Sequence, residues 1–120
     1  MSVWIVVVVV AAAGVWWWLR SRPLAKLALR EGDTTGVEFP LTARETTIGS
    51  EAGQTVVVSH PRVSRHHAVI ARTDEGTFVL RDRSKHGTMV NGAPVTEHVL
   101  ESGDLIRLAG AVDLIFTRLG

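Results

Sequence analysis

Residues 59–67 have the sequence Ser-His-Pro-Arg-Val-Ser-Arg-His-His, and residues 81–88 have the sequence Arg-Asp-Arg-Ser-Lys-His-Gly-Thr. The first segment contains two hydroxyl groups, two arginines and three histidines, and the second contains three cations, one histidine and two hydroxyl groups. Hydroxyl and cationic donors in two loops suit an oxyanion such as phosphate, provided that the fold brings the loops together. These segments therefore predict an anion site, and their flanks indicate the fold.

The flanks contain short apolar runs separated by turn residues, without a sustained 3.6-residue period. Ten short runs in under 100 residues predict an all-β sandwich or barrel. Asn91-Gly92 predicts a tight hairpin that needs positive φ. The candidate strands are residues 24–30, 37–41, 46–48, 55–58, 67–72, 77–80, 88–90, 94–95, 105–108 and 112–118.

Composition divides the 120-residue chain into two parts. Residues 1–19 hold 17 apolar residues, and the only charges in the first thirty residues are four cations. Residues 31–120 carry nine Lys/Arg and twelve Asp/Glu, a net charge of −3, although residues 62–85 hold six cations against three acids. Because affinity for a phosphate backbone needs a summed positive field, a nucleic-acid-binding domain is disfavoured. The absence of cysteine excludes disulfides and thiol catalysis.

Residues 3–19 predict a transmembrane helix. They contain no charge and reach about 25 Å as a helix, at the short end of what spans a bilayer. Three tryptophans at 16–18 precede Arg20, which is typical of a membrane interface. The alternatives are a buried core helix and a cleaved signal peptide with its site at residues 11–13, although signal peptides carry their cations before the apolar run.

The cations after the apolar run also predict the orientation. By the positive-inside rule, the N-terminus lies outside and the body lies in the cytoplasm, so we expect a single-pass protein of the plasma membrane. The expected organisation is an anchor over residues 1–20, a short basic linker over 21–23 and one domain over 24–120.

Four blocks occur in order in the body: Thr47-Ile48-Gly49, Pro61-Arg62-Val63-Ser64-Arg65-His66-His67-Ala68, Ser84-Lys85-His86-Gly87-Thr88-Met89-Val90-Asn91-Gly92, and Ser102-Gly103-Asp104-Leu105-Ile106. With these blocks, residues 24–120 resemble a forkhead-associated (FHA) domain, a β-sandwich module that binds phosphothreonine peptides. The resemblance implies an FHA-type sandwich of about 10–11 short strands, preceded here by the predicted transmembrane helix. It also implies that the binding loops lie at the end of the sandwich away from the chain termini.

The resemblance assigns residues to a phosphopeptide site. Ser64 matches the serine whose hydroxyl donates to the phosphate, Arg65 follows it, and Lys85 matches a neighbouring loop position that can also touch the phosphate. Arg62 corresponds to a position where some relatives recognise the side chain three residues beyond the phosphothreonine, although a solvent-exposed arginine is the simpler interpretation. The residues that the resemblance makes structural are Gly49, His67, Gly87 and Asn91.

Two departures from the family pattern concern the same site. The family's Gly-Arg pair, whose arginine contacts the phosphate, is Gly49-Ser50 here, and its Asn-Gly-Thr is His86-Gly87-Thr88. Histidine still donates a hydrogen bond, so His86 and Thr88 remain in the predicted site, as does Ser50 at the arginine position. Without the arginine, binding loses a charge-assisted hydrogen bond of about 1.5–3 kcal/mol, roughly ten- to a hundredfold in affinity, unless Lys85 or Arg65 compensates.

Two functions remain open at this point. The first is a membrane-anchored adaptor, without cofactor or catalysis. It binds a protein that a separate kinase has phosphorylated on threonine. The second is a degenerate FHA scaffold for phosphate-independent protein contacts, which Ser50 favours.

A metal site and a hydrolase are disfavoured. His60, His66 and His67 do not form a zinc set, because adjacent strand residues point to opposite faces and no nearby acid completes it. A Ser64–His67–Asp104 triad lacks a nucleophile elbow.

Overall fold

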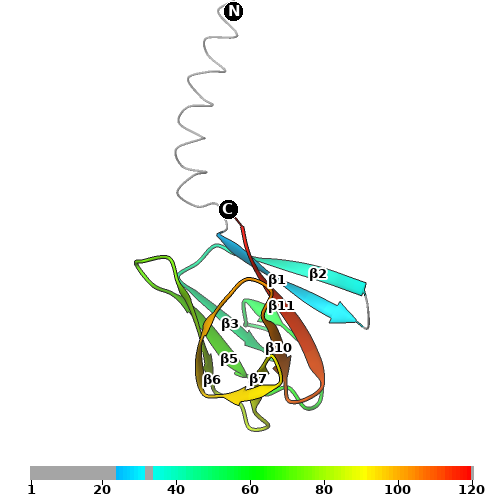
Figure 1. Ribbon diagram of the computed structural model, residues 1–120. Coiled ribbons are helices and arrows are strands. Elements are labelled where there is room, and N and C mark those ends of the chain that lie inside the picture. Colours follow the sequence, from blue (N-terminus) through cyan, green and yellow to red (C-terminus); the bar gives the residue numbers. More distant parts are fainter. Residues whose placement is uncertain (1–23, 32–33, 120) are drawn as a thin grey trace, which may run out of the picture.

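The computed structural model describes residues 24–31 and 34–119. These residues form two facing β-sheets (Figure 1). The six-stranded sheet has the order β2-β1-β11-β10-β7-β8, and the five-stranded sheet has the order β4-β3-β5-β6-β9. The strands are β1 (Ala25–Glu31), β2 (Thr34–Leu41), β3 (Glu45–Gly49), β4 (Val56–Val57), β5 (Ala68–Arg72), β6 (Phe78–Asp82), β7 (Thr88–Val90), β8 (Ala93–Val95), β9 (Glu97–Leu100), β10 (Leu105–Leu108) and β11 (Val112–Arg118).

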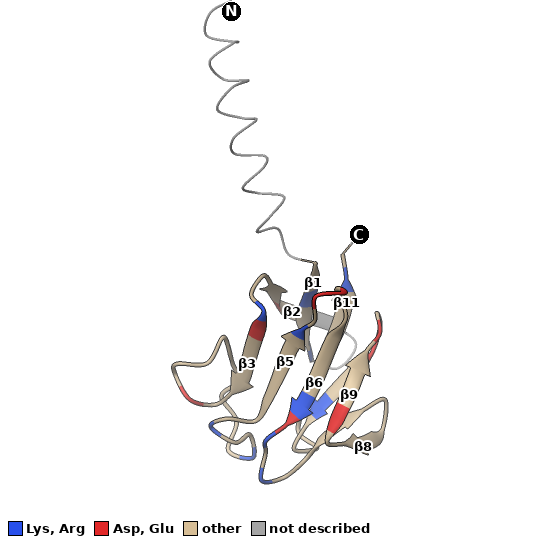
Figure 2. Ribbon diagram, turned by 90° about the vertical axis from the view of Figure 1, so that its left-hand side faces the viewer, with Lys and Arg blue, Asp and Glu red and all other residues tan. Residues whose placement is uncertain are grey.

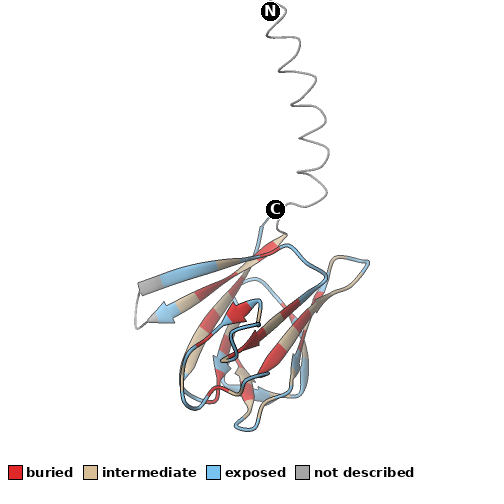
Figure 3. Ribbon diagram, turned by 180° about the vertical axis from the view of Figure 1, so that it is seen from behind, coloured by how far each residue is buried: buried red, intermediate tan, exposed pale blue. Residues whose placement is uncertain are grey.

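The core lies between the sheets and follows the two-residue period of the strands. In β5, Ala68 and Ile70 are buried while Val69 between them is only half-buried, because successive side chains point to opposite faces. Phe78 of one sheet meets Phe116 of the other edge-to-face, with ring centroids 5.2 Å apart. Such pairs stabilise by about 0.5–1.5 kcal/mol beyond the area they bury. Figure 3 shows buried segments on strands of both sheets.

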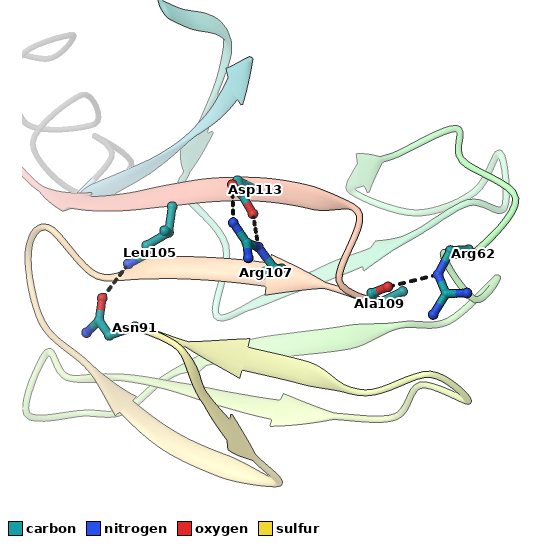
Figure 4. Close-up of polar contacts among 6 residues, drawn as sticks. All are labelled: Arg62, Asn91, Leu105, Arg107, Ala109 and Asp113. Carbon is teal, nitrogen blue, oxygen red and sulfur yellow. Dashed lines mark hydrogen bonds and ion pairs between the residues drawn. The ribbon is translucent and has the colours of Figure 1, made fainter. Parts of the chain in front are cut away.

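The all-β sandwich predicted from the sequence is confirmed, and each of the ten expected strands overlaps an observed one. The sequence missed β9, an edge strand in which only Leu100 is buried. The hairpin prediction is also confirmed, since Asn91 has φ of 52° and Gly92 has φ of 85°. The Asn91 side chain holds this turn beside β10 by accepting a hydrogen bond from Leu105 N at 3.0 Å (Figure 4).

The expected transmembrane helix and the basic linker lie outside the described residues. Over residues 24–31 and 34–119, no helix is long and apolar enough to cross a membrane.

The described chain begins and ends at the same end of the sandwich. Leu119 N donates to Leu24 O at 2.8 Å, and Ala25 of β1 pairs with Arg118 of β11. The loops after β3, β4 and β6 and the β10–β11 turn lie at the opposite end (Figure 1). This is the placement that the family resemblance implies, and it leaves the loop end open.

Candidate functional site

Three loops meet at the open end: β3–β4 (residues 50–55), β4–β5 (58–67) and β6–β7 (83–87). Together they line an open hollow of about 650 Å³, here called the loop hollow. It brings together six of the seven residues that the sequence assigns to phosphopeptide binding. The residues lining it are Ser50, Glu51, Pro61, Arg62, Val63, Ser64, Arg65, His66, Lys85 and His86.

Ser64 connects the three loops through hydrogen bonds. Its Oγ accepts a hydrogen bond from Lys85 N at 3.0 Å, and its carbonyl oxygen accepts one from Ser50 N at 3.0 Å. Because the Ser64 oxygen is the acceptor in its contact with Lys85, the hydroxyl proton is left to donate elsewhere. A half-buried hydroxyl with a fixed oxygen position can therefore direct a hydrogen bond at an anion in the hollow.

His67 explains why Ser64 holds this position. The His67 side chain is fully buried; its Nδ1 accepts from Ser64 N at 3.1 Å, and its Nε2 lies 3.0 Å from Gly87 O. These partners require a neutral ring protonated at Nε2. Burial lowers the pKa of His67, outweighing the opposite effects of the hydrogen bond to Gly87 and the charge of Asp82. His67 thus joins the β4–β5 and β6–β7 loops, as the resemblance implies.

Asp82 holds the β6–β7 loop, a role that the sequence analysis missed. One carboxylate oxygen, Oδ1, accepts hydrogen bonds from Ser84 N at 3.0 Å, Ser84 Oγ at 2.6 Å and Thr88 Oγ1 at 2.8 Å. Burial alone raises the pKa of Asp82, but the hydrogen bonds from Ser84 and Thr88 outweigh it and lower the pKa. The available signal was the Asp-x-Ser spacing, because an aspartate commonly hydrogen-bonds the backbone two residues later.

The hollow is rich in cationic side chains, and two of them are free to bind an anion. In the part of the chain that the structure describes, the exposed side chains of Arg65 and Lys85 form no ion pair or hydrogen bond. Arg62 differs, because its Nε donates to Ala109 O at 3.0 Å (Figure 4). Figure 2 shows Lys and Arg segments on the loops at this end. The positive charge expected over residues 62–85 is therefore partly gathered at the hollow.

One acid also lines the hollow and was not expected from the sequence. Glu51 Oε2 lies 2.9 Å from His66 Nε2, and His66 Nδ1 lies 3.0 Å from Gln54 Nε2. Because the amide nitrogen of Gln54 can only donate, His66 Nδ1 accepts and His66 Nε2 donates to the Glu51 carboxylate. Both ring nitrogens of His66 are thus occupied. His66 therefore stabilises the β3–β4 loop. It has no free ring nitrogen to take over the phosphate contact of the arginine that the family pattern has at position 50.

Comparison with known proteins decides the family. The FHA domain family matches residues 46–109, slightly more than half of the chain. This chain belongs to the FHA family. The matched residues form a small domain of this family.

Two relatives of this FHA domain come from Mycobacterium tuberculosis and Corynebacterium efficiens. The ABC transporter ATP-binding/permease protein Rv1747 of Mycobacterium tuberculosis is 39% identical over 88 residues, which are 73% of this chain and 10% of the transporter. The oxoglutarate dehydrogenase inhibitor of Corynebacterium efficiens is 36% identical over 93 residues, which are 77% of this chain and 64% of the inhibitor. The chain thus spans less than two thirds of either relative.

Solved structures show the same FHA fold. A domain from a study of phosphothreonine-dependent FHA interactions has a TM-score of 0.72 and 32% identity, and the match covers 80% of this chain and 97% of that one. The FhaA FHA domain, solved in complex with the intracellular domain of Rv3910, has a TM-score of 0.69 and 33% identity over 77% of this chain and 98% of that one.

The remaining predicted residues lie outside the loop hollow of this FHA domain. Thr88 is buried, and its hydroxyl donates to Asp82, so it supports the β6–β7 loop. Asn91 lies at the β7–β8 turn, where its amide donates to Asp104 Oδ1 at 2.9 Å. The Ser64–His67–Asp104 triad is not assembled, because Ser64 contacts His67 through its backbone N and Asp104 accepts from Asn91 and Glu101 N instead.

Proposed function

We propose that this chain is a membrane-anchored adaptor whose FHA domain binds threonine-phosphorylated proteins at the cytoplasmic face of the membrane. The observation that carries the proposal is the Ser64 hydroxyl, held between loops with the unpartnered cations Arg65 and Lys85 beside it. Phosphothreonine carries a charge of about −1.5 to −2 at pH 7, so it suits one positioned donor flanked by two unpaired cations.

The fixed loops add to this argument. Ser64 is tied to Ser50, Lys85 and His67 by hydrogen bonds within the protein. Because these bonds constrain the Ser64 hydroxyl independently of a ligand, less conformational entropy is lost on binding. Two FHA relatives support the phosphate part of the proposal: one comes from a study of phosphothreonine-dependent interactions, and EmbR of Mycobacterium tuberculosis, 30% identical, was solved with a low-affinity phosphopeptide.

A phosphopeptide titration tests the binding proposal. The full chain, reconstituted in lipid nanodiscs, is titrated with phosphothreonine peptides and with their unphosphorylated forms. We expect phosphate-dependent binding that falls at least about tenfold in Ser64→Ala, because one hydrogen bond to a charged group is lost. Thr42→Ala, which removes an exposed hydroxyl from the β2–β3 turn at the other end of the sandwich, serves as the control. Unchanged affinity in Ser64→Ala would contradict the assignment of this residue.

Membrane anchoring is proposed from the apolar residues 3–19 and the cations that follow them. In this arrangement the loop hollow, which lies at the end opposite residue 24, faces the cytosol. The measurement is fractionation of the full chain after an alkaline carbonate wash. We expect the chain in the membrane pellet and a variant lacking residues 3–19 in the supernatant. A mature chain that begins near residue 14 would instead identify a cleaved signal peptide.

The alternative is a phosphate-independent scaffold, and two residues favour it. Ser50 stands where the family has a phosphate-binding arginine, and Glu51 places a carboxylate on the same hollow. Like charges near a phosphate reduce its binding. Equal affinity for phosphorylated and unphosphorylated peptides throughout the titration would establish the scaffold and end the adaptor proposal.

A further inference from the structure

A second hollow lies beside the first and has a different character. It measures about 300 Å³ and is formed by β1, β2, β4 and the start of β11; it is here called the side groove. Arg30, Ser59 and His60 contribute polar groups to its wall. Most of its lining is apolar, namely Leu29, Phe39, Val57, Val58, Ala111 and Val112.

The side groove and the loop hollow share one continuous wall. Residues 57–60 of β4 and the β4–β5 loop line the groove, and residues 61–66 of the same loop line the hollow. At the junction, His60 Nδ1 accepts from Arg62 N at 3.1 Å, and His60 O accepts from Val63 N at 3.0 Å. The wall is therefore a hydrogen-bonded turn that separates the two hollows.

The turn is also fixed from the opposite side. Arg62 Nε donates to Ala109 O at 3.0 Å (Figure 4), and Ala111, two residues further on, lines the side groove. Ala109 is buried and has φ of 55°, a backbone conformation that a non-glycine residue rarely adopts. Arg62 thus couples the loop hollow to the β10–β11 turn that closes the groove.

The groove leaves apolar surface open to solvent at its edge. Val57 is 41% exposed on β4, a two-residue edge strand that pairs only with β3 in the described structure. An edge strand and a concave apolar lining together suit an extended peptide segment with one large apolar side chain. A volume near 300 Å³ is enough for a leucine or phenylalanine side chain and too small for a second folded element.

We propose that the phosphoprotein bound at the loop hollow also places a large aliphatic or aromatic side chain in the side groove, several residues away from its phosphothreonine. The proposal rests on the proposed function, because the two hollows are to be filled by one ligand. Because residue 50 is serine, the phosphate site has one cation fewer than the family pattern. The apolar contact in the side groove then supplies affinity and sequence selectivity that do not depend on charge.

A leucine scan tests the proposal. The full chain in nanodiscs is titrated with alanine-background phosphothreonine peptides that carry one leucine at each position from four to eight residues away, on either side. We expect one position, or two adjacent ones, to raise the affinity about five- to tenfold, below the full value of a buried leucine because the peptide loses entropy. All other positions should bind like the alanine peptide.

Groove variants locate the effect. Ala111→Glu should abolish the leucine gain, and Val57→Thr, an uncharged change at the exposed rim, should reduce it. Ala43→Glu, at an exposed alanine of the β2–β3 turn at the other end of the sandwich, should retain it. The quantity compared is the ratio of affinities for the leucine and alanine peptides, so a general repulsion of phosphate by Glu cancels. Thermal melting confirms that each variant is folded.

The possible results separate the two proposals. A flat leucine scan with intact phosphate dependence would overturn the groove proposal and leave the adaptor proposal standing. Binding that depends on phosphate in no peptide would overturn both. A leucine gain that survives Ala111→Glu and Val57→Thr would also overturn the groove proposal. The groove proposal would also be overturned if Ala111→Glu changed the oligomeric state in light scattering and left the leucine gain unchanged. That result would assign the groove to a second copy of the chain.

Discussion

The carbonyl oxygen of Arg65 lies directly over Gly49, so that a Cβ atom built on Gly49 would come within 1.9 Å of it. The carbonyl carbon of Arg65 would be 2.7 Å away and the Ser64 carbonyl oxygen 3.1 Å away. These are backbone atoms and cannot rotate aside. The end of β3 and the loop that carries Ser64 therefore contact each other through a glycine, and any side chain at this position would push the loop outward.

Replacing Gly49 with alanine should destabilise the domain and weaken phosphopeptide binding together. We expect a loss of about 3 kcal/mol, the upper end of the cost of overpacking a core position. Chemical denaturation measures the stability. Gly53→Ala is the control, because its Cβ would meet nothing within 4 Å and its φ is not positive. A Gly49→Ala variant as stable as Gly53→Ala would show that the loop can move at no cost.

Restoring the family arginine should strengthen phosphate binding. Ser50 lines the loop hollow and its N donates to Ser64 O, so an arginine there is positioned to reach an anion beside Ser64. Ser50→Arg should raise affinity for phosphothreonine peptides roughly ten- to a hundredfold, the value of one charge-assisted hydrogen bond. Ala52→Arg adds the same charge to the same loop outside the hollow and should gain far less. Equal gains in a fluorescence anisotropy titration would indicate a general charge effect.

His67 should make the domain sensitive to mild acid. Because burial lowers the His67 pKa in the folded state, the unfolded chain binds more protons once the pH falls below about 6.5. The stability that His67 contributes is complete above that pH and decreases as the pH falls toward the folded-state pKa. His67→Gln should be less stable than the wild type at pH 8 but lose less stability between pH 7 and pH 5. Parallel pH profiles from urea denaturation would contradict this expectation.

Removing the charge of Asp82 should loosen the β6–β7 loop. Asp82→Asn keeps the shape but weakens three hydrogen bonds to one oxygen, and we expect a cost of about 1–2 kcal/mol with a parallel loss of peptide affinity. The low pKa of Asp82 means that the wild type should show the same loss as the pH falls through that pKa.

The matched control for Asp82 is Asp74→Asn. Asp74 forms an exposed ion pair with Arg44, with the two side chains 80% and 77% exposed, and such pairs contribute about 0–1 kcal/mol. Differential scanning calorimetry of both variants should place the Asp82→Asn midpoint clearly below that of Asp74→Asn. Similar midpoints would show that Asp82 does not hold the loop.

The sequence was sufficient for the fold because its signals are local. Asn91-Gly92 needs positive φ at both residues, and β5 is a short apolar run, Ala-Val-Ile-Ala, that is followed by the charged Arg72. The strand β9 escaped prediction because it is an edge strand with His98 half-buried and Val99 55% exposed, so its apolar pattern does not alternate as that of an inner strand does.

Most residues of the site were predictable from the sequence, but the contacts between them were not. The motifs predicted that Ser64, Arg65 and Lys85 lie together, because both loop segments contain hydroxyl and cationic donors that suit an anion. The contact of Arg62 with Ala109 joins residues 47 positions apart and depends on a positive φ at an alanine, which no local pattern indicates. The pairing of Glu51 with His66 likewise arises only when the β3–β4 and β4–β5 loops fold against each other.

The pairing of the first and last strands determines how the domain responds to a pulling force. Hydrogen bonds between antiparallel strands run perpendicular to the strands. Tension applied between residues 24 and 119 would open the β1–β11 ladder one pair at a time, beginning at Ala25 and Arg118. Tension between residue 24 and a partner held at the opposite end would run along the strands and strain many of these bonds simultaneously. A bound partner therefore pulls on the domain in its mechanically stronger direction.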